Sequence, residues 1–426
     1  MNILKCIDEL KSKRVKGLFA KLYGDDENAI QYQLNRYSNA IETFKQIFPE
    51  RSDIKIYSAS GRTEIGGNHT DHQRGVVLAG AVNLDIVAVV SFHNDGVIRV
   101  KSEGYEMAEV KLCELTPTET DNGTRALIRG IAAKFAESGV DIKGFDAYTV
   151  SDVISGGGIS SSAAFETLIG TIINNYYNDD KFTPFEIAQI GWFAENKFFG
   201  KKCGLLDQTV SSYGGLITAD FNDVTNPEIE QIAFDFEKFG YALCITDTKS
   251  SHADLTDDYD SITDEMKQVS HHFGCEVLSQ VDEVQFYANI AELRKTCCDR
   301  ALLRAMHFFN ETKRAGYEAA ALKNNDIDLF LKLVNESGES SAMLLQNLYS
   351  TKTPTQQAIP LGIALSKAVL NGRGAVRVHG GGFAGTIQAY VPVEIVNDYK
   401  TAMESVYGND TCHLVRIRPF GGIEII

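Results

Sequence analysis

The stretch Gly156-Gly157-Gly158-Ile159-Ser160-Ser161-Ser162-Ala163-Ala164 decides the fold prediction, because it joins a glycine run to the start of a helix. Three consecutive glycines leave a backbone without Cβ atoms, so a ligand can approach it closely. The apolar residues that follow recur at helical spacing: Phe165, Leu168, Ile169, Ile172, Ile173 and Tyr176. A helix N-terminus has unpaired N–H groups and a positive dipole end, so the stretch predicts an anion-binding turn. A glycine run alone is also typical of an ordinary turn capped by serine.

Length, charge and cysteine usage limit the class of protein. The 426 residues are 44% hydrophobic, which is enough to fill two ordinary cores. A net charge of −16 without a basic block predicts no nucleic-acid or anionic-membrane partner. No apolar leader is visible, and no run approaches the roughly 20 apolar residues of a membrane span. Eight scattered cysteines without a CxxC pair indicate free thiols, so we expect a cytoplasmic protein.

Hydrophobic periodicity predicts a chain of mixed helices and strands. Residues 1–50 have helical spacing and are expected to pack against the rest of the protein. Strands are expected over 55–58, 84–92, 97–101, 145–150, 241–246 and 386–391. Helices are expected over 121–138, 183–199, 261–275, 288–309 and 326–335, with a loop over 200–213.

Two polar stretches are candidate binding segments. Gly61-Arg62-Thr63-Glu64-Ile65-Gly66-Gly67-Asn68-His69-Thr70-Asp71-His72-Gln73 interrupts two apolar strands, and its composition suits a binding loop. The alternative for this segment is a solvated loop. The second stretch is Cys203-Gly204-Leu205-Leu206-Asp207-Gln208, in which an isolated aspartate is also explained as a helix cap.

Four segments resemble the motifs of the GHMP kinases and, within them, the galactokinases. Residues 61–72 are similar to the family pattern GRxNLIGEHTDY, and 156–164 to GxGLSSSA. Glu195-Asn196 with 203–208 are similar to EN…CGxMDQ, and 380–385 to GGGFGG. The four motifs occur in the family's order from about residue 55 to the end of the chain.

The resemblance implies an α+β fold of two domains with the active site between them. The N-terminal domain would span 1–225, with a helical extension over 1–50, and the C-terminal domain 226–426. It implies ATP-dependent phosphorylation of the C1 hydroxyl of galactose, giving galactose 1-phosphate and ADP, with Mg²⁺. Galacturonate, N-acetylgalactosamine and arabinose stay open as substrates, and so does a non-catalytic sugar sensor. The intact Ser162-Ala163, Arg62 and Asp207 favour an enzyme, whose oligomeric state the sequence leaves open.

The resemblance also implies a catalytic pair, Asp207 and Arg62, beside the sugar's anomeric hydroxyl. A carboxylate beside a guanidinium stays ionised, so it can accept a proton or a hydrogen bond from the attacking hydroxyl. Removal of that proton and simple orientation of the hydroxyl are both compatible with the sequence.

By the same resemblance, the serine-rich motif binds the nucleotide. The expected ATP-binding residues are Gly156, Gly157, Gly158, Ser160, Ser161, Ser162, Ala163, Gly381 and Gly382. Ser162 and Glu195 are the expected Mg²⁺ partners.

The expected sugar-binding residues are Asn68, His69, Asp71, Tyr259 and Asp207. Asn68 stands where galactokinases have a glutamate near the sugar's 6-hydroxyl, and an amide can donate as well as accept. Loss of that negative charge would make a carboxylate at C6 easier to accept, and the following pair 72–73 resembles the galacturonate kinases. Galactose stays the first candidate because the other sugar contacts are retained.

Overall fold

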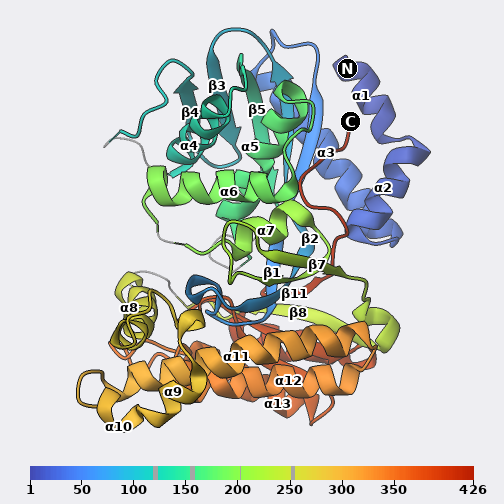
Figure 1. The fold of residues 1–426 in the computed structure, drawn as a ribbon. Helices are drawn as coiled ribbons and strands as arrows, with labels where there is room; N and C mark the ends of the chain where they lie inside the picture. The colour runs from blue at the N-terminus through green and yellow to red at the C-terminus, as the bar shows by residue number, and fades with distance from the viewer. Residues whose placement is uncertain (119–122, 154–158, 202, 251–254) are drawn as a thin grey trace.

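The computed structural model describes residues 1–426 except 119–122, 154–158, 202 and 251–254 (Figure 1). Within these described residues the strands form two sheets. The larger sheet has the order β12-β1-β2-β5-β3-β4, with β6 and β7 continuing from β2. Its strands are β1 (Lys55–Gly66), β2 (Val76–Phe92), β3 (Val97–Ser102), β4 (Met107–Lys111), β5 (Phe145–Ser151), β6 (Leu216–Asp220), β7 (Glu228–Ile232) and β12 (Ile423–Glu424). This mixed architecture confirms the expected α+β class.

The N-terminal helices cover one face of the larger sheet, as the spacing over 1–50 predicts (Figure 1). They are α1 (Ile3–Leu10), α2 (Lys13–Tyr23) and α3 (Glu27–Ile47). Each begins at a residue whose side chain accepts a backbone N–H bond: Asn2, Ser12 and Asp26. Their apolar faces share a core with β2 and the C-terminal tail. The extension is therefore an integral layer of this part of the protein.

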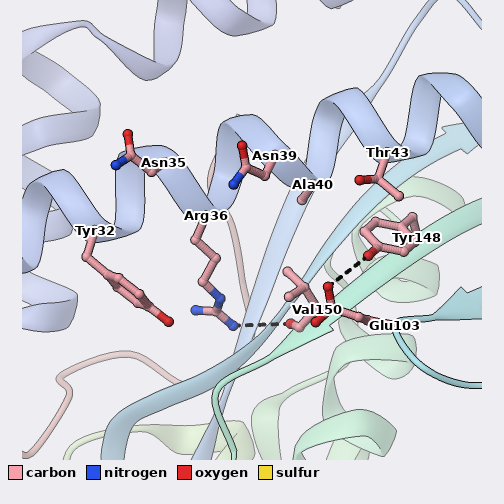
Figure 2. A pocket seen from close by; sticks show the side chains of 9 residues that line it. All are labelled: Tyr32, Asn35, Arg36, Asn39, Ala40, Thr43, Glu103, Tyr148 and Val150. Carbon is pink, nitrogen blue, oxygen red and sulfur yellow. Dashed lines mark hydrogen bonds between the residues drawn. The ribbon is translucent and has the colours of Figure 1, made fainter.

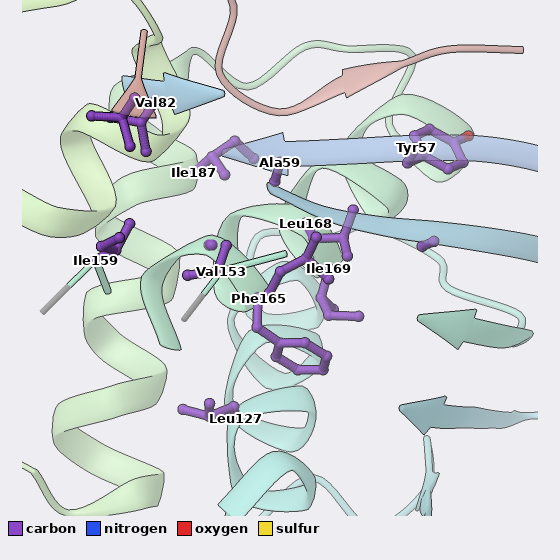
Figure 3. Close-up of a cluster of buried hydrophobic side chains, with 14 of the residues drawn as sticks. Tyr57, Ala59, Val82, Leu127, Val153, Ile159, Phe165, Leu168, Ile169 and Ile187 are labelled. Carbon is purple, nitrogen blue, oxygen red and sulfur yellow. The ribbon is translucent and has the colours of Figure 1, made fainter. Parts of the chain in front are cut away.

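Three helices cover the opposite face: α4 (Gly123–Glu137), α5 (Ser161–Tyr177) and α6 (Pro184–Ala194). Figure 3 shows Phe165, Leu168 and Ile169 of α5 packed among buried side chains of the sheet and α4. The α6 helix begins with a capping box of Thr183 and Glu186 and continues into a π turn over Glu195–Phe199. The helix expected over 183–199 is thus confirmed, and so is that expected over 121–138 from Gly123 onward, since 121–122 lie outside the described residues.

The second half of the chain forms a helical layer on a smaller sheet of order β11-β8-β10-β9. The strands are β8 (Tyr241–Asp247), β9 (Ala375–His379), β10 (Thr386–Pro392) and β11 (Cys412–Val415). The helices are α8 (Thr256–His272), α9 (Glu283–Ala288), α10 (Ile290–Leu293), α11 (Asp299–Lys323), α12 (Ile327–Ser340), α13 (Ala358–Leu370) and α14 (Val396–Tyr407). None of the described helices combines the length and the hydropathy needed to cross a membrane.

Three sequence expectations are wrong in their extent. The single helix expected over 288–309 is broken at Cys298, whose backbone is extended. The sequence does not reveal the break, because the buried Leu293, Cys297 and Ala301 keep helical spacing across it. The polar stretch 61–73 is a loop only from Gly67 onward, since β1 continues through two bulges to Gly66. The loop expected over 200–213 ends in a helix, α7 (Leu206–Tyr213), which buries Leu206 and Val210.

The division at residue 225 stays a prediction. Strands β7 and β12 come after that point in the chain, and both belong to the larger sheet. The polar half of β1 in turn reaches the smaller sheet, where Thr63 Oγ1 lies 3.1 Å from His379 Nε2. The two halves are therefore joined by strands and hydrogen bonds in both directions.

Candidate active site

Arg62 and Asp207 form a bidentate ion pair, although 145 residues separate them. Arg62 Nε lies 2.6 Å from Asp207 Oδ1, and Nη2 lies 3.0 Å from Oδ2. Arg62 follows a bulge of β1, and Asp207 lies in the first turn of α7. Burial opposes ionisation of Asp207, but the charge and hydrogen bonds of Arg62 outweigh it and hold the pKa of the carboxyl below its usual range. The carboxylate is therefore ionised at neutral pH.

Ser160 connects this pair to the start of α5. Its hydroxyl donates to Asp207 Oδ2, and its backbone is left-handed with a φ of 57°. Ser160 is the N-cap residue of α5, yet its side chain makes no cap bond because the hydroxyl is engaged by Asp207. The end of the predicted nucleotide turn thus touches the predicted catalytic aspartate. Gly156, Gly157 and Gly158 lie outside the described residues.

Ser162 and Glu195, the expected Mg²⁺ partners, are in direct contact. Ser162 Oγ donates to Glu195 Oε1 at 3.1 Å, and Lys201 Nζ donates to the same oxygen at 2.9 Å. Gln208 Nε2 holds the other oxygen, Oε2, at 2.8 Å. Carboxylate and hydroxyl oxygens are the hard donors that Mg²⁺ prefers. The donor set therefore fits a magnesium ion.

Two of the sugar-binding candidates, His69 and Tyr259, contact the glycine turn between β9 and β10. His69 Nε2 lies 2.9 Å from the oxygen of Gly381, and Tyr259 Oη donates to the oxygen of Gly382 at 2.9 Å. Burial lowers the pKa of His69 to about 4, so the imidazole is neutral and its Nε2–H donates to Gly381.

Asp71 lies close enough to Asp207 for the charge of Asp207 to affect the pKa of Asp71. Burial and the neighbouring charges of Asp207 and Glu64 raise the pKa of Asp71 to about 6. Its carboxylate packs so closely on Gly204 that a Cβ there would meet Asp71 Oδ2 at 1.9 Å. Only a glycine leaves room for the carboxylate in this position.

Asn68 is part of the buried framework beneath the loop. Its side chain is 0% exposed, and Nδ2 donates at 2.8 Å to both Glu64 Oε1 and the Gly380 oxygen. Its Oδ1 accepts from Asn347 at 2.9 Å and from Ser341 at 3.3 Å. Both amide hydrogens and both lone pairs are thus used within the protein. The expected sugar contact of Asn68 stays a prediction that these bonds do not favour.

Gly381 and Gly382 do not contact the described part of the nucleotide segment through any hydrogen bond that the structure describes. Their carbonyl oxygens bind His69, Asn347 and Tyr259 instead. Ser161 begins α5, and Ala163 is fully buried within it. The expected nucleotide contact of the two glycines stays a prediction that these bonds do not favour.

Three polar residues at the site have no role in the sequence-based prediction. Gln208 bridges two carboxylates, because its Nε2 also lies 3.0 Å from Glu166 Oε2. Burial and the nearby Glu195 raise the pKa of Glu166 well above its usual range. Glu166 was detectable as the one carboxylate in the apolar run after Ser162, one helical turn away. Lys201 was detectable as a charge inside the third motif.

A surface groove of about 230 Å³ lies elsewhere, between α3 and β5 (Figure 2). Figure 2 shows Tyr148 donating to Glu103 at one end and Arg36 donating to the Val150 oxygen at the other. None of its lining residues is a predicted site residue. The predicted catalytic groups therefore cluster away from this groove.

Comparisons with known proteins agree with this geometry. Residues 42–92 match the galactokinase galactose-binding signature, and 126–215 match the GHMP kinase N-terminal domain. The Lactococcus lactis galactokinase complexed with galactose is 21% identical, with a TM-score of 0.78 over 91% of this chain and 99% of that chain. A D-glycero-D-manno-heptose 1-phosphate kinase from Bacteroides thetaiotaomicron is 14% identical, with a TM-score of 0.58 over 87% and 98%. The Methanococcus jannaschii mevalonate kinase is 16% identical, with a TM-score of 0.57 over 86% and 98%.

These structures share the fold of this chain. Together with the two family models, which match 42–92 and 126–215, they show that the chain is similar to the GHMP kinases. Within that family the chain resembles the galactokinases, which confirms the resemblance noted in the sequence.

Proposed function

We propose that this kinase transfers the γ-phosphoryl group of ATP to the C1 hydroxyl of galactose, giving galactose 1-phosphate and ADP. The contact that carries the proposal is the Arg62–Asp207–Ser160 junction, which joins an ionised carboxylate to the start of the nucleotide helix. The galactose-binding signature over 42–92 supports the choice of sugar. We also propose a cytoplasmic enzyme that acts on small molecules.

Asp207 accepts the proton, or the hydrogen bond, of the attacking hydroxyl. Arg62 keeps the carboxylate ionised and donates to both of its oxygens, which fixes the orientation of the carboxylate. A loose phosphoryl-transfer transition state demands little basicity, so a carboxylate with a lowered pKa is sufficient. Orientation of the hydroxyl then contributes as much as removal of its proton.

Ser162 and Glu195 hold the magnesium ion of the nucleotide, and the first turn of α5 faces the phosphates. Bound Mg²⁺ neutralises charge on the phosphates and makes the leaving group easier to expel. Gln208 keeps Glu195 in place through its 2.8 Å bond to Oε2. Gly156, Gly157 and Gly158, which we assign to the phosphates by resemblance, complete this part of the site.

His69, Asp71 and Tyr259 recognise the sugar from the glycine turn. Beyond the bonds that hold them on the glycine turn, neutral His69 has Nδ1 and Tyr259 its hydroxyl oxygen as acceptors, and Asp71 binds ring hydroxyls as an acceptor when ionised. Asn68 acts behind them by holding Glu64 and the backbone of Gly380. The lost charge at position 68 therefore no longer argues for a carboxylate at C6, and galactose is the preferred substrate.

The test is sugar-dependent ADP release by the full-length chain. Galactose, galacturonate, N-acetylgalactosamine and arabinose are compared at equal concentration with Mg²⁺ and ATP. We expect galactose to give the highest kcat/KM and a product whose phosphorus signal couples to the anomeric proton. Preference for another of the four sugars would name that sugar instead. Binding of sugar and ATP without ADP release would mean a sensor and would contradict the proposal.

A further inference from the structure

Lys201 is a cation that contacts Glu195, an expected Mg²⁺ partner, and lies close enough to the catalytic candidate Asp207 to affect its pKa. Its Nζ lies 2.9 Å from Glu195 Oε1, and its side chain is 58% exposed whereas that of Glu195 is 2% exposed. Burial raises the pKa of Asp207, but the charge of Arg62 and, more weakly, that of Lys201 lower it overall. The ammonium of Lys201 thus acts on both carboxylates.

Arg62, a second cation among the described residues of this junction, already binds Asp207. Two nitrogens of Arg62 bind Asp207, the carboxylate that accepts the proton or hydrogen bond of the sugar hydroxyl. Phosphoryl transfer also needs positive charge on the moving group, because its three equatorial oxygens carry the negative charge of the transition state. In a chain of net charge −16, any such charge beyond that of Mg²⁺ comes from local residues.

The present partner of Lys201 is the oxygen expected to bind the metal. Glu195 Oε1 already accepts from Ser162 and Lys201, so a divalent cation on that oxygen would repel the ammonium. The ammonium is free to respond because it ends a flexible stem that is largely in solvent. Phosphate oxygens bound at the start of α5 would then be new partners for the displaced ammonium.

We propose that Lys201 is a further catalytic residue, which leaves Glu195 when the metal nucleotide binds and donates to the transferred phosphoryl group. This inference rests on the proposed kinase function. In the step, the bond from the γ-phosphorus to the β–γ bridging oxygen breaks, and a bond to the sugar oxygen forms. The hydroxyl proton goes to Asp207, directly or through water, and the electron pair stays on ADP. Lys201 keeps its protons throughout.

The test compares ATP and ADP binding, measured by calorimetry with Mg²⁺ and without sugar, in Lys201→Met, Lys201→Arg and the parent protein. We expect Lys201→Met to weaken ATP about 10-fold with ADP within twofold, and Lys201→Arg to retain most of the preference. In turnover, we expect Lys201→Met to lower kcat about 10- to 100-fold with the sugar KM unchanged. The matched control is Lys295→Met, since Lys295 is an exposed lysine in the turn after α10, paired with Glu292 at 2.6 Å.

The alternative is that Lys201 only holds Glu195. Lys201→Met would then change the Mg²⁺ concentration dependence or the melting temperature and leave the ratio of ATP to ADP affinity intact, which would overturn the proposal. Because the calorimetry uses no sugar, it separates this inference from the choice of substrate. A parent protein that prefers ATP but phosphorylates none of the sugars would contradict the proposed function, and loss of the preference in Lys201→Met would still support Lys201.

Discussion

Asp85 and Arg418 form a fully buried ion pair, with Arg418 Nη1 2.8 Å from Asp85 Oδ2. The same carboxylate accepts from Arg36 Nη1 at 2.7 Å and from the Tyr23 hydroxyl at 2.6 Å. One aspartate of β2 therefore joins the N-terminal helices to the C-terminal tail. Arg36 also binds Asp152 at 2.9 Å, at the end of the strand that leads to the nucleotide segment.

Asp85→Asn is expected to destabilise the protein by about 3–5 kcal/mol, because it leaves two buried guanidinium groups without their charge partner. Burial raises the pKa of Asp85, but Arg36 and Arg418 lower it overall. The stability from ionised Asp85 is thus present above its unfolded pKa and lost as the pH falls through the lower folded value. Urea unfolding at pH 7 checks the size, with exposed Asp8→Asn as the control. A loss below 1 kcal/mol would contradict the role given to this pair.

Asn68→Glu, which restores the residue typical of galactokinases, is expected to cost about 3 kcal/mol or more. A second carboxylate would face Glu64 in a fully buried position and could not donate to it. Thermal unfolding measures the loss, and Asn68→Gln tests whether an amide alone suffices. A variant with unchanged melting temperature and a lower galactose KM would instead place residue 68 in contact with the sugar.

Position 68 also illustrates what the sequence could not reveal. The resemblance of the motifs predicts that Arg62 lies near Asp207 and Ser162 near Glu195, because the residues to which the family assigns these roles are present in each motif. The polar end of β1 has the composition of a loop in the sequence. Its Thr63 and Glu64 are buried in a strand because their partners, His379 and Arg377, come from over 300 residues away. Local periodicity has no access to such partners. The same holds for Asn68, whose partners Ser341, Asn347 and Gly380 lie more than 270 residues away.

The raised pKa of Asp71 predicts that sugar binding depends on pH. Burial first, and then the charge of Asp207, raise its pKa to about 6, so the carboxylate gains a proton below that pH. We expect the sugar KM to rise as the pH falls from 7 to 5, up to about tenfold per unit, while the ATP KM stays constant. Initial rates across this range check the prediction. A sugar KM that is flat from pH 7 to 5 would remove Asp71 from the sugar site.

The raised pKa of Asp71 also predicts that its ionised carboxylate lowers the free energy of unfolding at neutral pH. A carboxyl with a raised folded pKa stabilises below its unfolded pKa, and that contribution is lost as the pH rises through about 6. Asp71→Asn should therefore be more stable at pH 7.5, on the order of 1 kcal/mol after solvent screening, and bind sugar poorly. Denaturant midpoints at pH 5 and pH 7.5 test the sign, and the gain should be smaller at pH 5.

Gly204→Ala is expected to separate sugar binding from nucleotide binding. The new Cβ would lie 1.9 Å from Asp71 Oδ2, so the carboxylate has to move. We expect the sugar KM to rise about 10-fold or more with the ATP KM within twofold and little change in stability. Gly316→Ala is the control, because a Cβ there has no neighbour within 4 Å. Equal sugar KM values for the two variants would contradict the position assigned to Asp71.

Asp207→Asn keeps the size of the side chain and removes its charge, so it isolates the carboxylate at the centre of the site. The most direct measurement is single-turnover ADP formation by this variant and the parent protein, with galactose and ATP affinities measured separately by calorimetry. We predict a loss of about 100-fold or more in the transfer rate, with both affinities within about threefold. A variant that binds both ligands and forms ADP at nearly the parental rate would show that Asp207 is not the group that receives the acceptor hydroxyl.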